Sequence, residues 1–190
     1  MDVDGLTFVC AMTVEERIAR RFGPATLVGL GVSRGLPQGE RLVSFGIAGS
    51  LRSDLPVGTV IDATRVVDES GAVLWEGGPL GARSARSGTI LGADRIVDSP
   101  SERARLREQT GADAVDMESA TLARSGRLAG CIRAISDTPT SRLAGLARAA
   151  KLSGHVDVLG FLRGFIAEPL ETTRAVVNAR RALRALEAVA

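Results

Sequence analysis

The stretch Leu6-Thr-Phe-Val-Cys-Ala-Met12, followed directly by Thr13-Val-Glu-Glu-Arg-Ile-Ala-Arg-Arg21, decides the fold class. The first segment is apolar and rich in strand formers, which predicts a short buried strand. The second has helical character, and Thr13 with Glu16 three residues later has the spacing of a capping box. Gly23-Pro24 is expected to end this helix. A strand that passes directly into a helix is typical of the start of an α/β fold.

The rest of the chain repeats this alternation. Further strands are expected at residues 25–32, 41–47, 58–64 with 66–67, 112–115 and 131–136. Helices are expected at residues 103–109, after the capping sequence Ser99-Pro-Ser-Glu102, and at 117–124, 143–152, 155–167 and 170–188. The glycine-rich residues 68–88 have no period and predict a loop with room for an edge hairpin. We therefore expect one domain over residues 1–190, with a three-layer α/β/α fold and a mixed, mostly parallel central sheet.

The composition argues against several kinds of function. The 24 basic residues nearly balance the 22 acidic ones, and aromatic side chains are scarce at 3%, so no nucleic-acid groove is indicated. Cys10 and Cys131 lie in apolar runs without metal-binding spacing, and His155 is the single histidine, so no metal site is predicted. The two thiols are interpreted as buried cysteines in a reducing compartment. No apolar run approaches the roughly 20 residues of a membrane span, and we expect a cytoplasmic location.

The segment Gly29-Leu-Gly31-Val-Ser-Arg-Gly35 follows a predicted strand, as a dinucleotide-binding loop would. Its spacing differs from that fingerprint, and Leu36-Pro-Gln-Gly39 stands where a phosphate-capping helix should begin. We interpret the segment as a turn and predict no redox cofactor.

Carboxylates follow three of the predicted strands, at the edge where open α/β sheets gather ligands. Glu15 and Glu16 follow the first strand, Asp116 and Glu118 follow residues 112–115, and Asp137 follows residues 131–136. Each has a structural alternative, because side chains at these places also cap helices, interact with helix dipoles or begin turns. Their occurrence together favours a functional site.

Several blocks resemble, in the same order, those of the purine nucleoside phosphorylase and methylthioadenosine/S-adenosylhomocysteine nucleosidase superfamily. They are Ala11-Met-Thr-Val-Glu15, Phe45-Gly-Ile-Ala-Gly-Ser-Leu51, Leu55-Pro-Val-Gly-Thr-Val-Ile61, Ala114-Val-Asp-Met-Glu-Ser-Ala120 and Arg133-Ala-Ile-Ser-Asp137. The C-terminal Gly154-His-Val-Asp-Val158 and the arginine-rich last helix are most similar to the hopanoid-associated branch. The resemblance implies a nucleoside phosphorylase-like fold, here somewhat truncated, that binds a small purine nucleoside and needs no cofactor or metal.

The resemblance also implies roles for the carboxylates. Glu118 would bind the ribose 2′- and 3′-hydroxyls, and Met117 would pack beside the sugar and base. Asp137 would be the acid, because the leaving purine must accept a proton as the glycosidic bond stretches. Glu15 would hold or deprotonate the attacking water.

The remaining implied roles concern positioning and the base. Ser136 would orient Asp137, while Ala48 and Gly49 would bring backbone amides close to the sugar or the nucleophile. Ile96 stands where the family often has an aromatic side chain that stacks on the base. Val97 would offer backbone hydrogen bonds to adenine.

The sequence departs from the phosphorylases of this superfamily around Gly46. They place an arginine and a serine there to hold phosphate, whereas this chain has Ser44 and Ile47. We therefore predict a nucleosidase that hydrolyses the N-glycosidic bond of an adenosine-type nucleoside and releases adenine. A phosphorylase that uses phosphate, and a module that binds a purine nucleoside without turnover, remain as alternatives.

The 5′ substituent of the substrate is left open among methylthioadenosine, S-adenosylhomocysteine and adenosylhopane. An apolar set on the two helices expected at 143–152 and 155–167 is a candidate wall for this group: Leu143, Leu146, Val156, Val158, Leu159 and Phe161. These side chains would equally well fill the core of a monomer. We expect a homodimer or a higher homo-oligomer, in which a second copy closes the 5′ site.

Overall fold

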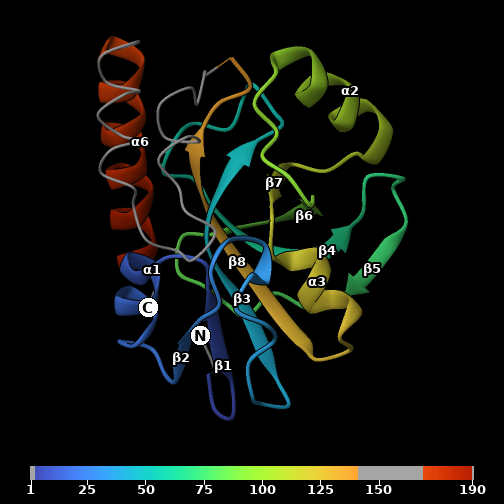
Figure 1. Cartoon of the computed structure of the whole chain (residues 1–190), viewed down its shortest axis with the longest axis vertical. Coiled ribbons are helices and arrows are strands. Elements are labelled where there is room, and N and C mark those ends of the chain that lie inside the picture. The colour runs from blue at the N-terminus through green and yellow to red at the C-terminus, as the bar shows by residue number, and fades with distance from the viewer. Residues whose placement is uncertain (1–2, 141–168, 190) are drawn as a thin grey trace.

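The computed structural model describes residues 3–140 and 169–189, and it consists of a central sheet with helices on both faces (Figure 1). The strands are β1 (Thr7–Cys10), β2 (Ala25–Leu27), β3 (Leu42–Ser50), β4 (Val60–Val67), β5 (Val73–Glu76), β6 (Arg86–Gly92), β7 (Ala114–Asp116) and β8 (Leu128–Asp137). The α-helices are α1 (Thr13–Ala19), α2 (Pro100–Thr110), α3 (Ser119–Arg124) and α6 (Pro169–Glu187), and η1 (Leu30–Val32) is a 3₁₀ helix. The helices expected at 143–152 and 155–167 lie outside the described residues.

All eight strands belong to one mixed sheet, as predicted. Strand β3 pairs with β1 and β8 in parallel and with β7 antiparallel. Strand β4 pairs with β6 in parallel and with β8 and β5 antiparallel. Because β6 also pairs with β7, strands β3, β8, β4, β6 and β7 close into a ring, from which β1, β2 and β5 extend. The closed ring fixes the strand ends from which the site is built.

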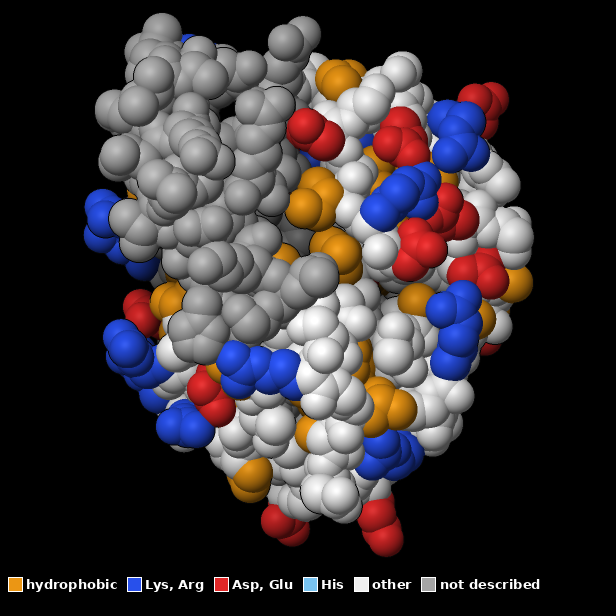
Figure 2. Space-filling model, viewed as in Figure 1, with side chains coloured by type: hydrophobic (Ala, Val, Ile, Leu, Met, Phe, Trp, Pro, Cys, Tyr) orange, Lys and Arg blue, Asp and Glu red, His pale blue; other side chains and the backbone are white. Residues whose placement is uncertain are grey.

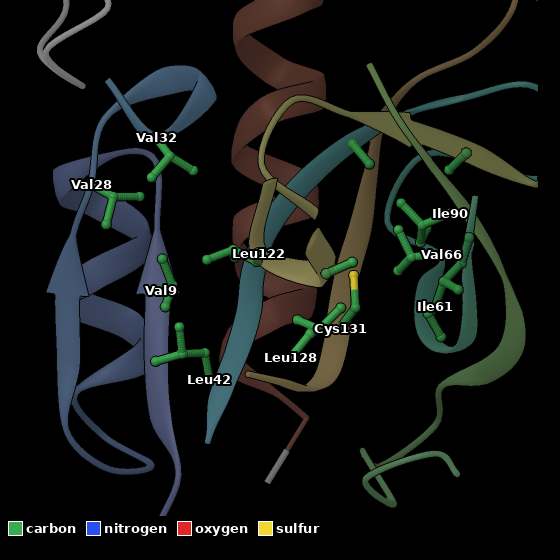
Figure 3. Packing of buried hydrophobic residues seen from close by; sticks show 14 of the residues in the cluster. Val9, Val28, Val32, Leu42, Ile61, Val66, Ile90, Leu122, Leu128 and Cys131 are labelled. Atoms are coloured by element: carbon green, nitrogen blue, oxygen red, sulfur yellow. The ribbon is translucent and has the colours of Figure 1, made fainter. Parts of the chain in front are cut away.

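Apolar side chains pack on both faces of this sheet. On one face, Phe8 and Phe45 meet edge to face at 5.5 Å and pack with Ile18 of α1 and Leu186 of α6. On the other face, a second cluster includes residues of β1, β3, β8 and α3, among them Leu122 (Figure 3). A third cluster joins Leu106 of α2 to β6 and β7. Both cysteines are buried, as predicted.

Helix α2 follows its sequence signals closely. The Ser99 hydroxyl accepts a hydrogen bond from the backbone N–H of Glu102, and Pro100 occupies the first turn. Gly111 ends the helix with a φ of 67°, a conformation that glycine adopts without strain. The β1–α1 start and the last helix after Pro169 are confirmed as well.

Two local predictions are wrong, and a third is confirmed only in part. The capping box does not use Thr13 and Glu16, because Met12 is the N-cap and Glu15 turns back to its backbone N–H. The strand expected at 25–32 ends at Leu27, since the left-handed glycines of η1 turn the chain there. The loop expected over 68–88 contains β5, in line with the expected hairpin, and also the start of β6.

The glycines of β6 kept this strand from being predicted from the sequence. Close packing explains why glycine is needed at these positions. A Cβ at Gly88 would lie 2.7 Å from the Asp113 carboxylate, and one at Gly92 would lie 2.4 Å from the backbone of Ala120 in α3. Glycine in a strand interior often marks such a close approach and weakens the strand signal in the sequence.

Candidate active site

A cavity of about 180 Å³ lies where β1, β3, β7 and β8 end, beside the segment that leads into α2. The predicted site residues come from five separate segments, and all of them line this cavity: Glu15, Ala48, Gly49, Ile96, Val97, Met117, Glu118, Ser136 and Asp137. Thus the fold brings together the carboxylates that the sequence places far apart.

Glu15 is buried in the first turn of α1 and is held by backbone donors. Its Oε2 accepts hydrogen bonds from the N–H groups of Ala11 at 3.1 Å and Met12 at 2.9 Å, and its Oε1 accepts one from Ile47 at 2.9 Å. Burial raises the pKa of this carboxyl, while the Arg133 guanidinium and the three N–H donors oppose the shift. The carboxylate is therefore fixed in place with its charge partly stabilised.

Glu118 follows β7 and is also buried. Its Oε1 accepts a 3.0 Å hydrogen bond from the backbone N–H of Gly31, and its Oε2 lies 3.3 Å from Arg133 Nη2. Burial raises the pKa of Glu118 to about 7, and Arg133 acts in the opposite direction. The segment Gly29–Gly35 is a turn, as predicted, but it also supplies this amide to the cavity wall, which the sequence did not indicate.

Arg133 of β8 is a buried cation beneath the cavity. Its Nη2 lies 2.5 Å from Asp116 Oδ2 and 2.5 Å from the Ser44 hydroxyl, in addition to its contact with Glu118. The Asp116 carboxylate also accepts hydrogen bonds from the backbone N–H and the hydroxyl of Ser119. One guanidinium thus faces Glu15, Asp116 and Glu118 together. Carboxyl groups thus outnumber guanidinium groups in this part of the site.

Asp137 ends β8, with a side chain that is almost fully buried. Its Oδ2 accepts a 2.8 Å hydrogen bond from the Ser136 hydroxyl, which also lies 3.1 Å from the Ala48 carbonyl oxygen. Its Oδ1 forms an ion pair with Arg103 of α2. Burial raises the pKa of Asp137, and the Arg103 cation opposes the shift.

The cavity wall also has an apolar part, formed by Ile96 and Val97. Val97 is buried, whereas Ile96 is 38% exposed at the rim. The Val97 carbonyl oxygen accepts a 3.0 Å hydrogen bond from Arg103 Nε. Beside Ile96, Arg95 lines the rim and pairs with Glu69 and Glu102.

Sequence reasoning missed the two buried arginines. Arg133 lies in the quoted Arg133–Asp137 block, and a charge inside an otherwise apolar strand was the available signal. Arg103 had no local signal, since arginine is ordinary on a helix surface. Within residues 3–140 and 169–189, there is no cluster of His, Cys, Asp and Glu suited to a metal ion.

Comparison with known proteins gives the family. Residues 76–178, more than half of the chain, match the family model described as the phosphorylase superfamily. The chain belongs to this superfamily. No match is found among curated proteins.

Solved structures of superfamily enzymes have the same fold. Helicobacter pylori 5′-methylthioadenosine/S-adenosylhomocysteine nucleosidase superposes with a TM-score of 0.57 at 20% identity, covering 88% of this chain and 100% of that one. Futalosine hydrolase of Helicobacter pylori superposes with a TM-score of 0.57 at 17% identity, covering 86% of this chain and 97% of that one. The 5′-methylthioadenosine/S-adenosylhomocysteine nucleosidase of Neisseria meningitidis, in complex with methylthio-immucillin-A, superposes with a TM-score of 0.56 at 19% identity. The match covers 96% of this chain and 97% of that one. The mixed α/β fold of this superfamily member is therefore nucleoside phosphorylase-like.

Two further observations concern partners. No helix in the described part of the chain is long and apolar enough to cross a membrane. On the face shown in Figure 2, acidic and basic side chains are interspersed over α2 and β5, without a patch of one sign there.

Proposed function

We propose that this protein is a nucleosidase that hydrolyses the N-glycosidic bond of an adenosine-type nucleoside and releases adenine. The observation that carries the proposal is the excess of buried carboxylates over guanidiniums around the cavity. Glu15, Asp116, Glu118 and Asp137 line it, and their buried cationic neighbours in the described residues are Arg103 and Arg133.

This charge balance suits the reaction. The sugar becomes oxocarbenium-like as the C1′–N9 bond breaks, and ionised carboxylates other than the proton donor Asp137 stabilise the developing cation. Glu118 accepts hydrogen bonds from the ribose hydroxyls. Glu15, whose carboxylate is fixed by backbone N–H groups, takes a proton from the water that attacks C1′. Asp137 gives a proton to a ring nitrogen of the leaving purine, which keeps the electron pair of the broken bond.

The same balance disfavours phosphate as the nucleophile. A phosphate site needs several donors aimed at one point, and the two arginines that line the described cavity are already engaged. Arg95 pairs with Glu69 and Glu102, and Arg103 pairs with Asp137. An incoming anion would also approach carboxylates that face the cavity.

Product analysis tests the proposal. Purified protein is incubated with 5′-methylthioadenosine in the presence and absence of inorganic phosphate, and the products are separated chromatographically. We expect adenine and the free sugar at a rate independent of phosphate. A sugar 1-phosphate as the main product would indicate a phosphorylase, and calorimetric binding without any product would indicate a binding module.

The nature of the 5′ group belongs to the same proposal. The apolar wall suggested for it lies at Leu143, Leu146, Val156, Val158, Leu159 and Phe161, which are outside the described residues. We infer a preference for an apolar 5′ substituent from the apolar character of these residues, and a homo-oligomer and a place in the hopanoid-associated branch from the sequence resemblance. The cytoplasmic location expected from the sequence belongs to the same proposal. Comparison of kcat/KM for adenosine and for an adenosine with a long apolar 5′ group tests the preference, and light scattering tests the assembly.

A further inference from the structure

Arg103 is an unusual residue for the first turn of a surface helix. Its side chain is 1% exposed, although its neighbours Ala104 and Arg105 are exposed. It extends from α2 to the cavity, where it is part of the wall. A buried guanidinium is costly unless it is paired and hydrogen-bonded, so its contacts point to a specific task.

The contacts of Arg103 converge on the end of the cavity that holds Asp137 and Val97. Its Nε donates a 3.0 Å hydrogen bond to the Val97 carbonyl oxygen. Its Nη1 forms the ion pair with Asp137 and donates a 2.9 Å hydrogen bond to the Thr138 carbonyl oxygen. One planar side chain therefore links the carboxylate to the segment that precedes α2, and its rigid fork limits the relative movement of the two.

The neighbouring strand makes room for this pair. A Cβ at Gly49 would lie 3.1 Å from Arg103 Nη2 and 3.1 Å from Asp137 Oδ1. Such distances are tighter than ordinary contacts, so a side chain there would press on both partners. The absence of a side chain at Gly49 thus allows the ion pair to lie against β3.

We propose that Arg103 is a positioning residue for glycosidic cleavage: through its ion pair with Asp137 and its hydrogen bond to Val97, it holds the two groups that face the leaving purine in one arrangement. This inference rests on the function proposed above. It adds a residue on α2 that none of the sequence blocks contains.

The proposal has a consequence for the pH dependence of the reaction. Asp137 must carry a proton to give one to the purine, so the rate falls as the pH rises through its pKa. The Arg103 cation favours the charged carboxylate and opposes the effect of burial. The other charged groups near Asp137 in the described residues are Asp98, from the segment before α2, and four residues that line the same cavity: Glu15, Arg95, Asp116 and Glu118. Loss of the Arg103 charge should therefore move the alkaline limb to higher pH.

The test compares three variants by their pH profiles of kcat and KM for adenine release from 5′-methylthioadenosine. Arg103→Gln removes the charge, Arg103→Lys keeps it but loses the planar fork, and Arg105→Gln is the control on the exposed side of the same helix, where Arg105 bonds only to Gln109 in the described structure. We expect Arg103→Gln to lower kcat by about 10- to 100-fold, because small misplacements of reacting groups cost this much. We also expect the alkaline limb of its kcat profile to lie at higher pH than that of the wild type.

Arg103→Lys should recover most of kcat and keep the limb near that of the wild type. Its KM should lie above that of the wild type, since one ammonium cannot reproduce the bonds to both Asp137 and Val97. Arg105→Gln should resemble the wild type. A purely structural role of Arg103 would lower activity at all pH values without moving the limb, and that result would overturn the proposal.

Comparison of a double variant with Asp137→Asn covers the case in which Arg103→Gln alone fails to fold. Arg103→Gln combined with Asp137→Asn removes both charges of the buried pair and so avoids an unpaired one. If Arg103 acts through Asp137, the added change should alter kcat of Asp137→Asn less than about 2-fold. A further loss of about 10-fold or more, the size expected for Arg103→Gln itself, would contradict the proposal while leaving the nucleosidase assignment intact. Absence of adenine release by the wild type would instead overturn both.

Discussion

The Oε1 atom of Glu15 accepts a 2.9 Å hydrogen bond from the backbone N–H of Ile47, and this contact ties α1 to β3 at the cavity. The other carboxylate oxygen accepts from Ala11 and Met12 at the end of β1. Glu15 therefore has a structural task in addition to its proposed role as the base. The two tasks are separable by experiment.

Glu15→Gln should reduce both activity and stability. A glutamine side chain has one acceptor oxygen and an NH₂ group, so at least one of the three backbone N–H groups would lose its partner. A buried donor without a partner costs about 1–3 kcal/mol, which urea unfolding should detect. Adenine release should fall by about 10²-fold or more, because an amide cannot take a proton from water.

Glu16→Gln is the matched control for this variant. Glu16 is the next residue of α1, and its carboxylate pairs with Arg20, whose side chain is exposed. The Glu16 side chain is 15% exposed, and pairs at the protein surface contribute at most about 1 kcal/mol. Near wild-type activity and stability are expected, and equal losses for Glu15→Gln and Glu16→Gln would exclude a special role for Glu15.

Gly46→Ala should disturb the same carboxylate from the opposite side. A Cβ at Gly46 would lie 2.4 Å from Glu15 Oε1 and 2.7 Å from Arg133 Nη1. Because backbone donors hold the carboxylate, it moves away only by giving up hydrogen bonds. We expect a loss of about 1–3 kcal/mol in unfolding free energy and a marked fall in kcat. Gly78→Ala is the control, since a Cβ there meets no atom within 4 Å.

Asp137→Asn tests the acid. An amide has no proton that it can readily transfer to the purine, so kcat should fall by about 10² to 10⁴, while the affinity for adenine measured by calorimetry changes little. If kcat of this variant equalled that of the wild type, a residue other than Asp137 would be the acid. Because Arg103 would then lack its ionic partner, thermal unfolding should be followed in parallel.

The sequence was sufficient for the features that depend on local patterns. The apolar run before Thr13, the Ser99 cap and Gly111 determine their elements through neighbouring residues, and the structure has them as expected. Strand β6 was missed because Gly88 and Gly92 are required by close approaches of Asp113 and Ala120, which are distant in sequence.

The candidate site likewise contains residues that the sequence predicted and residues that it did not. The carboxylates were found because each follows a strand in a block that resembles the superfamily. Arg103 was not found from the sequence, since its partner Asp137 comes from another element and a helix surface is the usual place for an arginine. Its burial follows from how α2 packs against the sheet, through Leu106 and Val97, and no local pattern encodes that packing.

The last prediction uses the pKa of Glu118, which burial raises from the ordinary 4.5 to about 7. Between these values the folded state binds more protons than the unfolded state, so the free energy of unfolding decreases as the pH rises. This contribution is fully present below pH 4.5 and is lost as the pH approaches about 7. Burial also raises the pKa values of Glu15 and Asp137, so these groups change the free energy of unfolding with pH in the same direction.

Glu118→Gln should therefore flatten the pH dependence of stability. Urea unfolding at pH 5 and pH 7.5 should show a smaller difference for the variant than for the wild type, because a glutamine does not titrate. Glu108→Gln on the exposed side of α2 controls for the loss of a carboxylate as such. An unchanged difference in Glu118→Gln would mean that Glu118 is ionised throughout this range, held so by Arg133 and the Gly31 amide. A flattened profile would instead show that Glu118 binds a proton near neutral pH, as expected where carboxylates outnumber the cations that neutralise them.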